Sequence, residues 1–332
     1  AAAEARAAAE PDATPVVAPT LPPVAPPCPY RGLFAFREKD AAFFFGREDF
    51  VDRLTETVEA RRLMAVVGPS GGGKSSVVFA GLLPRLKQAS SLRQAQGKAW
   101  VSADLRPGNR PFESLAAALV PSGTPDRLAE IQQLAELLRR GALGLAGAVQ
   151  RLLGSQPDAN RLLLAVDQFE ELFTVCPEPE TRRAFMDCLL EGVRHSPALH
   201  VVCTLRADFL GQAFSHRPFA DALQDANLIL GPMTRQELGR AIREPARKQG
   251  VRFQSGLVER ILDDVGDEPG NLPLLEFALT ALWDRQTNHI LTHDAYEEIE
   301  RVDGALARYA DEIFTGLAPH QQDPARRIFV QM

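Results

Sequence analysis

The sequence predicts an α/β fold, in which helices cover a parallel β-sheet and a helical region follows. Between Tyr30 and Thr234, short apolar runs alternate with amphipathic stretches of helical period, the pattern of parallel strands joined by helices. A glycine-rich loop, GPSGGGKS, comes directly after the first apolar run and before a helical stretch. No strand pattern appears after Thr234. A chain of 332 residues is long enough for two or three domains.

The composition is that of a soluble globular protein, with 45% hydrophobic and 24% charged residues. The formal net charge of -6 argues against a polyanion-binding surface spread over the whole molecule. The four cysteines are far apart and form no CxxC pair, so neither a disulfide framework nor a zinc site is indicated. No apolar run approaches the roughly 18 to 20 residues that cross a bilayer, and no secretory signal begins the chain. We therefore expect a cytoplasmic protein that binds no membrane.

The first 29 residues are dominated by alanine and proline. This composition neither sustains a helix nor builds a core, so residues 1–29 are interpreted as a disordered linker. Because the linker opens a chain whose first residue is not Met, we expect another module upstream in a longer protein. A disordered tail without a neighbour is the alternative.

Five short, nearly continuous apolar runs follow, as expected of strands that helices cover on both faces. The strand candidates are residues 63–67, 99–104, 162–167, 200–205 and 228–230. Helical periodicity lies between them, for example at residues 126–139 and 181–194. After Thr234, the helical candidates are residues 235–249, 255–265, 272–285, 292–302 and 324–332. An all-helical second domain is therefore predicted, and the last stretch suggests entry into a third.

The glycine-rich loop has the context that a phosphate-binding loop requires, between a predicted strand and a predicted helix at 74–86. Its glycines let the backbone curl so that successive N–H groups point at phosphate oxygens, and the helix N-terminus adds a positive dipole end. Lys74 is expected to bridge the β- and γ-phosphates, and the Ser75 hydroxyl to bind Mg²⁺. The predicted nucleotide-binding residues are Gly68, Pro69, Ser70, Gly71, Gly72, Gly73, Lys74, Ser75 and Ser76.

An acidic residue at the end of a neighbouring strand completes such magnesium sites, directly or through water. Asp167 ends the run LLLAVD and is expected to fill this role. Glu170 and Glu171 follow it closely, and we expect one of them to polarise the attacking water. Spacing does not choose between them, and a capping role at a helix N-terminus is the alternative for either.

Arg206 follows the fourth predicted strand. Ligands of open α/β sheets lie beyond the carboxyl ends of the strands, so Arg206 is expected to point toward the nucleotide and to read the γ-phosphate. A surface ion pair with Asp208 is the alternative, because short R-x-D sequences are common.

Two segments bear on recognition of the base. The sequence FFFGRE at residues 43–48 places Phe45, Gly46 and Arg47 where a clasp over an adenine would form, although three consecutive Phe are also typical of a core. Pro273 lies at a predicted helix start, where a plain helix N-terminus is the alternative. A GTPase would carry an NKxD motif, and no Asn-Lys pair occurs in the sequence. ATP or ADP, with Mg²⁺, is therefore the expected ligand.

With these residues placed, the sequence resembles the STAND class of signal-transducing ATPases, and most closely the bacterial group called novel STAND type one. The resemblance covers nearly everything from Pro29 to the end of the chain. The blocks DQFEELF and LPLLEFAL are not general features of P-loop proteins, so the combination is specific. The motifs are PYRGL (29–33), FFFGRE (43–48), VVGPSGGGKSS (66–76), LLLAVDQFEELF (162–173), VVCTLRADFL (201–210), GPM (231–233) and GNLPLLEFALTALW (270–283).

The resemblance implies three structural units. Residues 30–233 would form a P-loop ATPase domain with a five-stranded parallel sheet in the order 5-1-4-3-2, residues 234–302 a helical lid, and residues 303–332 the truncated start of a winged-helix domain. Arg206 matches the class's sensor arginine, Gly46 and Arg47 match its adenine-side clasp, and Pro273 matches the lid proline that packs on the base. The histidine with which the winged helix contacts ADP would lie beyond Met332.

The resemblance also implies a switch. In this class ADP holds a closed resting form, and exchange for ATP opens the lid and permits oligomerisation. A slow ATPase in bacterial signalling or defence is therefore expected, with an effector upstream, a WD-repeat sensor downstream and a nucleotide-dependent homo-oligomer. A lid residue at the base and a sheet residue at the γ-phosphate would give ADP and ATP different affinities for the two states.

Two other functions are weighed against the switch. A nucleic-acid-remodelling ATPase of the AAA+ or origin-recognition kind shares the fold and the FGRE clasp, but the acidic balance and the lack of a basic helix make nucleic acid an unlikely partner. A nucleotide-binding scaffold without turnover is the other alternative. The presence of Lys74, Asp167 and two adjacent glutamates argues against it.

Overall fold

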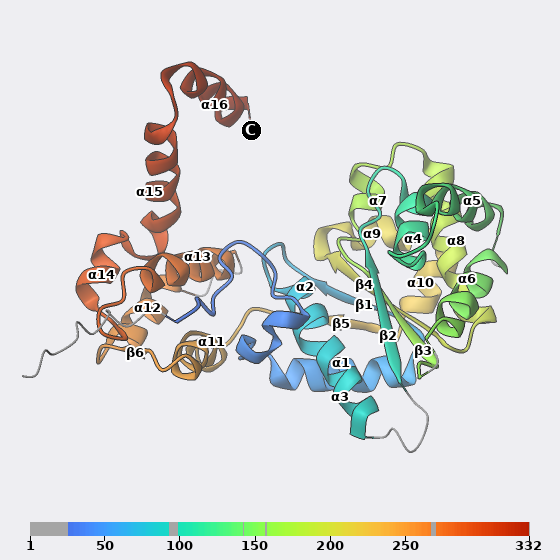
Figure 1. Cartoon of the computed structure of the whole chain (residues 1–332), viewed down its shortest axis with the longest axis horizontal. Coiled ribbons are helices and arrows are strands. Elements are labelled where there is room, and N and C mark those ends of the chain that lie inside the picture. The colour runs from blue at the N-terminus through green and yellow to red at the C-terminus, as the bar shows by residue number, and fades with distance from the viewer. Residues whose placement is uncertain (1–25, 93–98, 142, 157, 267–269, 332) are drawn as a thin grey trace, which may run out of the picture.

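The computed structural model describes residues 26–92, 99–141, 143–156, 158–266 and 270–331. Five of its strands form one parallel sheet (Figure 1). Each strand overlaps one of the five apolar runs, so the strand prediction is confirmed. The strands are β1 (Leu63–Gly68), β2 (Trp100–Leu105), β3 (Arg161–Val166), β4 (Leu199–Arg206) and β5 (Asn227–Ile229).

The strand order is β2-β3-β4-β1-β5, which is the expected order 5-1-4-3-2 read from the other edge. All four neighbouring pairs are parallel, so their carboxyl ends meet at one edge of the sheet. The register pairs Gly68 of β1 with Arg206 of β4. The glycine-rich loop and the segment after β4 therefore leave the sheet side by side.

Helices cover both faces of the sheet. Along β1, Leu63, Ala65 and Val67 pack into one core and Met64 and Val66 into the other, because successive side chains of a strand point to opposite faces. The sheet is therefore buried on both sides, as its apolar runs predict. The first core includes α4 (Pro111–Leu119), α5 (Arg127–Arg140), α6 (Leu143–Gly154), α8 (Pro179–His195) and α10 (Arg217–Leu223). The second includes α1 (Glu48–Ala60), the π-helical η2 (Val77–Leu82) and α3 (Leu83–Leu92).

Short elements connect these layers. The helix after the glycine-rich loop was predicted at 74–86 and is longer, because α2, η2 and α3 follow one another without a gap. The remaining short elements are η1 (Glu38–Phe43), α2 (Lys74–Ser76), α7 (Glu171–Thr174), η4 (Ala207–Phe209) and α9 (Leu210–Phe214).

A second body follows β5 and has its own apolar core; it lies beside the carboxyl edge of the sheet (Figure 1). We call it the lid after the role that the resemblance leads us to expect. Its first helix begins where the sequence predicts because Thr234 and Glu237 form a reciprocal cap. The Thr234 hydroxyl accepts the Glu237 N–H at 3.3 Å and the Glu237 carboxylate accepts the Thr234 N–H at 2.6 Å. The lid helices are α11 (Arg235–Lys248), α12 (Leu257–Val265), α13 (Asn271–Trp283) and α14 (His293–Glu298).

Two expectations for the lid were wrong. Strands do not stop at Thr234, because β6 (Arg252–Phe253) and β7 (Ile290–Leu291) form a parallel pair. Strands of two residues are too short to show a period of two in the sequence. The helix predicted at 292–302 is broken, because Glu300 and Arg301 have φ values of 64° and 61°, outside the right-handed helical region. Helix α14 therefore ends before Glu300, and a separate helix, α15 (Arg301–Gly316), begins at Arg301.

The C-terminal helices α15 and α16 (Pro319–Gln331) extend away from the rest of the molecule (Figure 1). The assignment of residues 303–332 to a winged-helix domain stays a prediction. Residues 1–25 of the predicted linker lie outside the described residues. None of the described helices combines the length and the apolar character that a bilayer crossing requires.

An N-terminal strap, residues 26–36, joins the lid to the sheet domain. The Tyr30 hydroxyl donates to the Ile242 carbonyl of α11 at 2.6 Å, and the Tyr30 side chain is only 3% exposed within the lid core. At the other end, the Phe36 N–H donates to the Ser76 hydroxyl at 3.2 Å. The predicted domain boundary at residue 30 is not tested by these contacts, but Tyr30 itself packs in the lid.

Candidate functional site

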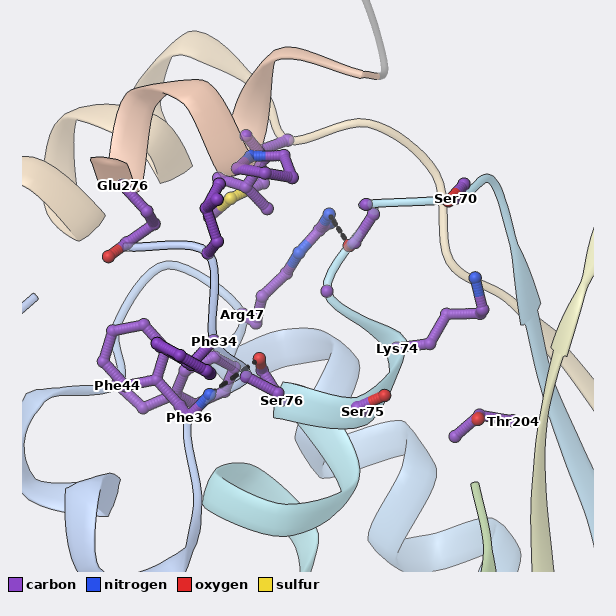
Figure 2. A pocket seen from close by; sticks show the side chains of 18 of the residues that line it. Phe34, Phe36, Phe44, Arg47, Ser70, Lys74, Ser75, Ser76, Thr204 and Glu276 are labelled. Atoms are coloured by element: carbon purple, nitrogen blue, oxygen red, sulfur yellow. Dashed lines mark hydrogen bonds between the residues drawn. The ribbon is translucent and has the colours of Figure 1, made fainter. Parts of the chain in front are cut away.

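A pocket lies at the carboxyl edge of the strands, between the sheet and the lid (Figure 2). Segments that are far apart in sequence meet there, as the topology of an open α/β sheet favours. The lining comes from residues 32–36, residues 43–45, Arg47, residues 70–76, the strand-end residues Arg106, Gln168, Glu170, Thr204 and Arg206, and the lid residues Met233, Ala241, Leu272, Pro273 and Glu276. The predicted residues Gly68, Pro69, Gly46, Asp167 and Glu171 do not line it.

The glycine-rich loop forms one wall of the pocket and ends in α2, which begins at Lys74. The N–H groups of a first helical turn lack partners within the helix and carry its positive dipole end. Gly71 has a φ of 71°, and a β-carbon built on it would lie 2.9 Å from the Pro273 ring. Only glycine therefore fits here, and the loop and the lid helix α13 are in direct contact.

Lys74 lies within this loop and is 8% exposed. Its Nζ donates to the carbonyl oxygens of Pro69 at 2.7 Å and Gly68 at 3.1 Å. Burial lowers the pKa of the Lys74 amine below its usual value, and the nearby Glu170 carboxylate acts in the opposite direction. The amine is thus held at the mouth of the loop, where phosphate oxygens would meet it.

Asp167 joins the loop to the ends of the neighbouring strands. It is 2% exposed, and its Oδ1 accepts hydrogen bonds from the Ser75 hydroxyl at 2.6 Å and the Thr204 hydroxyl at 2.8 Å. Its Oδ2 lies 3.4 Å from the Arg106 Nε. Ser75 and Asp167, which the sequence predicts separately as Mg²⁺ ligands, are therefore in direct contact.

The Ser75 and Asp167 oxygens fit Mg²⁺ in chemistry, because both are hard donors on adjacent elements. Within the described part of the chain, no group of three or more His, Cys, Asp or Glu residues could hold a metal by itself. A magnesium ion here would thus take its remaining ligands from phosphate oxygens and water, which is how Mg²⁺ is usually bound beside a nucleotide.

The structure distinguishes Glu170 from Glu171, which sequence spacing could not do. Glu170 lines the pocket, and its Oε2 accepts the main-chain N–H of Arg206 at 3.2 Å. The Glu171 Oε2 accepts the N–H of Gly108 at 3.2 Å, outside the pocket lining. Glu170 precedes α7 but its side chain makes no capping hydrogen bond, so the capping alternative fails for this residue.

Arg206 lines the pocket and also makes the ion pair that was its alternative role. Its Nε and Nη2 donate to the Asp208 oxygens at 3.1 and 2.7 Å. The hydrogen bonds from Arg206 lower the pKa of the Asp208 carboxyl. The guanidinium therefore has an anionic partner at the pocket edge, which a phosphate would have to displace.

The predicted adenine clasp is divided between three positions. Phe45 lines the pocket. Gly46 has a φ of 87°, and a β-carbon there would lie 2.5 Å from the Glu237 carbonyl oxygen, so this glycine permits the close approach of α11. Arg47 is buried, and its Nη2 donates to the carbonyl oxygens of Gly231 at 2.8 Å and Gly72 at 3.4 Å. Arg47 thereby ties the loop to the connection that enters the lid.

Several pocket residues were not predicted from the sequence. Gly32, Leu33 and Thr204 lie within family motifs. Nothing local assigns these residues, the rest of the strap or Arg106 to a pocket, because their partners lie far away in the chain. Glu276 follows Pro273 by three positions, and this spacing on one helix face is a signal that would have identified it. Its Oε2 accepts the Arg31 N–H at 3.2 Å, and burial raises the pKa of its carboxyl to about 7.

Solved structures share this fold. The ORC1 protein of Aeropyrum pernix, solved in complex with DNA, matches with a TM-score of 0.55 and 17% identity over 83% of this chain and 70% of that chain. A Walker-type ATPase of Pyrococcus abyssi matches with a TM-score of 0.51 and 15% identity over 88% of this chain and 78% of that one. The ORC2 protein of Aeropyrum pernix, in ADPNP–ADP complexes, matches with a TM-score of 0.52 and 15% identity over 79% of this chain and 68% of that chain.

Identities this low establish the fold alone. No curated protein sequence matches the chain. A family model, described as novel STAND NTPase 1, matches residues 29–332, which include the phosphate loop, Asp167, Arg206 and the lid helix α13. This range extends over nearly the whole chain and confirms the resemblance inferred from the motifs. The chain is a P-loop NTPase and belongs to the novel STAND NTPase 1 family.

Proposed function

We propose that this chain is an ATP-binding and slowly ATP-hydrolysing switch, in which exchange of ADP for ATP controls opening of the lid and oligomerisation. One observation carries the proposal: the phosphate loop and the lid line the same pocket, and Pro273 of α13 packs directly on Gly71. A nucleotide in this pocket would touch both bodies. Its γ-phosphate would therefore change the balance between two positions of the lid.

The phosphate end supplies the groups that the proposed turnover needs. The Lys74 Nζ would exchange its bonds to the Gly68 and Pro69 carbonyl oxygens for bonds to β- and γ-phosphate oxygens. Ser75 and Asp167 would hold Mg²⁺, which neutralises phosphate charge when bound. Glu170, which lines the pocket, would orient the attacking water. We assign this role to Glu170 rather than Glu171, which bonds to Gly108.

The proposed sensing of the γ-phosphate depends on Arg206. Its guanidinium pairs with Asp208 through two hydrogen bonds, and an ATP γ-phosphate would compete with Asp208 for the same donors. ADP lacks the group that competes. Because the Arg206 N–H also donates to the Glu170 carboxylate, a change at Arg206 would reach the residue proposed to orient water.

The experiment is to identify the nucleotide that co-purifies and to measure the mass of the chain in solution with ADP and with a non-hydrolysable ATP analogue. Assembly with the analogue but not with ADP would support the switch. The same mass in solution with ADP and with the ATP analogue would contradict nucleotide-dependent assembly by this chain. In Arg206→Ala, ADP and the ATP analogue should give the same mass in solution. Arg217→Ala is the matched control, because Arg217 is an exposed arginine of α10 outside the pocket.

Two further proposals follow from the family. The module would work in the cytoplasm of a bacterium, in signalling or defence, linked to an effector and a WD-repeat sensor. The alternative, a nucleic-acid-remodelling ATPase, shares the fold of the ORC1 protein that was solved with DNA. DNA binding that weakens steeply with salt would favour this alternative.

A further inference from the structure

A carboxyl group lies at the end of the pocket that is remote from the phosphate loop. Figure 2 shows Glu276 and the rings of Phe34, Phe36 and Phe44 on one side, and Lys74 with Ser75 and Thr204 on the other. If the phosphates of a nucleotide occupy the loop, its base lies at the Glu276 end. The groups there are aromatic and apolar, which suits a flat heterocycle.

We propose that Glu276 is the residue that selects the base, accepting a hydrogen bond from the exocyclic amine of adenine and rejecting guanine. The inference deepens the proposed function and rests on it. Glu276 follows Pro273 by three positions in α13, about 4.5 Å along the helix axis. Pro273 lies against the phosphate loop at Gly71, so the same face of the helix carries Glu276 onward to the base.

The hydrogen bonding of Glu276 leaves one oxygen for a ligand. Its Oε2 accepts the Arg31 N–H at 3.2 Å, and among the described residues no lysine, arginine or histidine forms an ion pair with it. A buried carboxylate without enough donors is costly, which is why burial raises the pKa of this group to about 7. A donor from a bound base would lower that cost.

The chemistry of the two purines then decides which base is accepted. At position 6, adenine carries an amine that donates, whereas guanine carries an oxygen that accepts. In its ionised form, the free Glu276 oxygen would bond to the adenine amine and repel the guanine oxygen. A carboxylate that recognises guanine accepts from N1–H and N2–H together and uses both oxygens. Here the Arg31 main chain already occupies Oε2.

The test is titration calorimetry of the nucleotide-free chain with ATP and with GTP, comparing the wild type with Glu276→Gln. A site built to hydrogen-bond one group rejects the wrong analogue strongly, so the wild type should prefer ATP by at least about 100-fold. The glutamine keeps an oxygen for the Arg31 N–H and adds an amide that donates to the guanine oxygen. Its preference should fall below about 10-fold, mainly through tighter GTP binding.

Two further variants complete the test. Glu298→Gln removes the same charge from an exposed lid residue outside the pocket and should keep the wild-type preference. Glu276→Ala should weaken ATP binding by about 10-fold, and thermal melts of each variant check folding. Wild-type selectivity in Glu276→Gln, or equal binding of ATP and GTP by the wild type, would overturn this inference alone. Failure of the wild type to bind any nucleotide would overturn the proposed function as well.

Discussion

The two ends of the pocket are built differently. At the phosphate end, Lys74, Ser75 and Asp167 belong to a loop and a strand end that the central sheet fixes directly, and they bond to one another or to the loop backbone. At the base end, Glu276 comes from a lid helix and bonds to the main chain of the strap at Arg31. The first end is charged and anchored to one body. The second is aromatic and assembled from several segments.

The difference indicates which contacts to a nucleotide would depend on the position of the lid. A parallel sheet with both faces buried leaves little freedom to the residues at its strand ends, so Lys74, Ser75 and Asp167 should keep their places when the lid is displaced. The base end exists only while the lid, the strap and the segment before α1 are packed together. Contacts to the base would therefore change with the position of the lid. The shape of the phosphate loop would be the constant part of the site, while its affinity for the γ-phosphate would follow the lid, as the proposed switch requires.

The largest expected effect is at the phosphate end. Lys74→Ala removes the one cation of the loop and, with it, two charge-assisted hydrogen bonds to phosphate worth about 1.5 to 3 kcal/mol each. ATP affinity measured by calorimetry should fall at least about 100-fold, to undetectable binding. Lys39→Ala, at an exposed residue of η1 outside the pocket, is the control. Normal ATP binding by Lys74→Ala would mean that the loop does not hold the phosphates.

A second prediction separates the two glutamates. Glu170→Gln should leave ATP binding within about threefold and slow hydrolysis by about 100-fold, the usual effect of losing a general base. Glu171→Gln keeps an oxygen for the Gly108 N–H and should hydrolyse ATP within about threefold of the wild type. Phosphate release under saturating ATP measures both. The opposite ranking of the variants would transfer the water-orienting role to Glu171.

A third prediction concerns stability at the base end. Burial raises the pKa of Glu276 to about 7 in the folded chain, whereas a free glutamate titrates near about 4.3. The folded state thus holds this proton more tightly, and the stability it provides is lost as the pH rises from about 4.3 to 7. Glu276→Gln should not suffer this loss.

Urea unfolding from pH 5 to pH 8 measures the effect. Because Glu276 as a whole residue is only half-buried, we expect the variant to gain about 1 to 2 kcal/mol over the wild type across this range, less than the full linkage. Glu298→Gln should track the wild type. A constant difference between Glu276→Gln and the wild type at every pH would show that the carboxyl titrates alike in the folded and unfolded chains.

The smallest expected effect is at the anchor of the strap. Tyr30→Phe removes the hydroxyl that donates to the Ile242 carbonyl oxygen while keeping the ring in the lid core. The free energy of unfolding should fall by about 1 kcal/mol, and the melting temperature by about 2 to 4 °C. Tyr309→Phe, a change of the same kind at an exposed ring, should be neutral. Equal melting of the two variants would indicate that the strap does not stabilise the lid.

Local pattern was sufficient for most of the fold. Each strand of the main sheet is a stretch whose apolar content can be read directly, and helices α5 and α8 show their period in the sequence. The errors lie where local pattern is weak. The strands β6 and β7 are too short to show a period of two in the sequence. The helix break at Glu300 depends on a left-handed backbone conformation, and this position has no glycine that would have predicted it.

The sequence by itself determined the phosphate end, because Lys74, Ser75 and Asp167 each lie within a contiguous motif whose backbone geometry is local. Only the tertiary structure decided which glutamate faces the pocket and that Glu276 meets Arg31 across 245 positions of the chain. The physical reason is that these contacts depend on how separate segments pack. A hydrogen bond between distant residues leaves no periodic trace in either segment, so the base end of the pocket appears only once the lid and the strap lie beside the sheet.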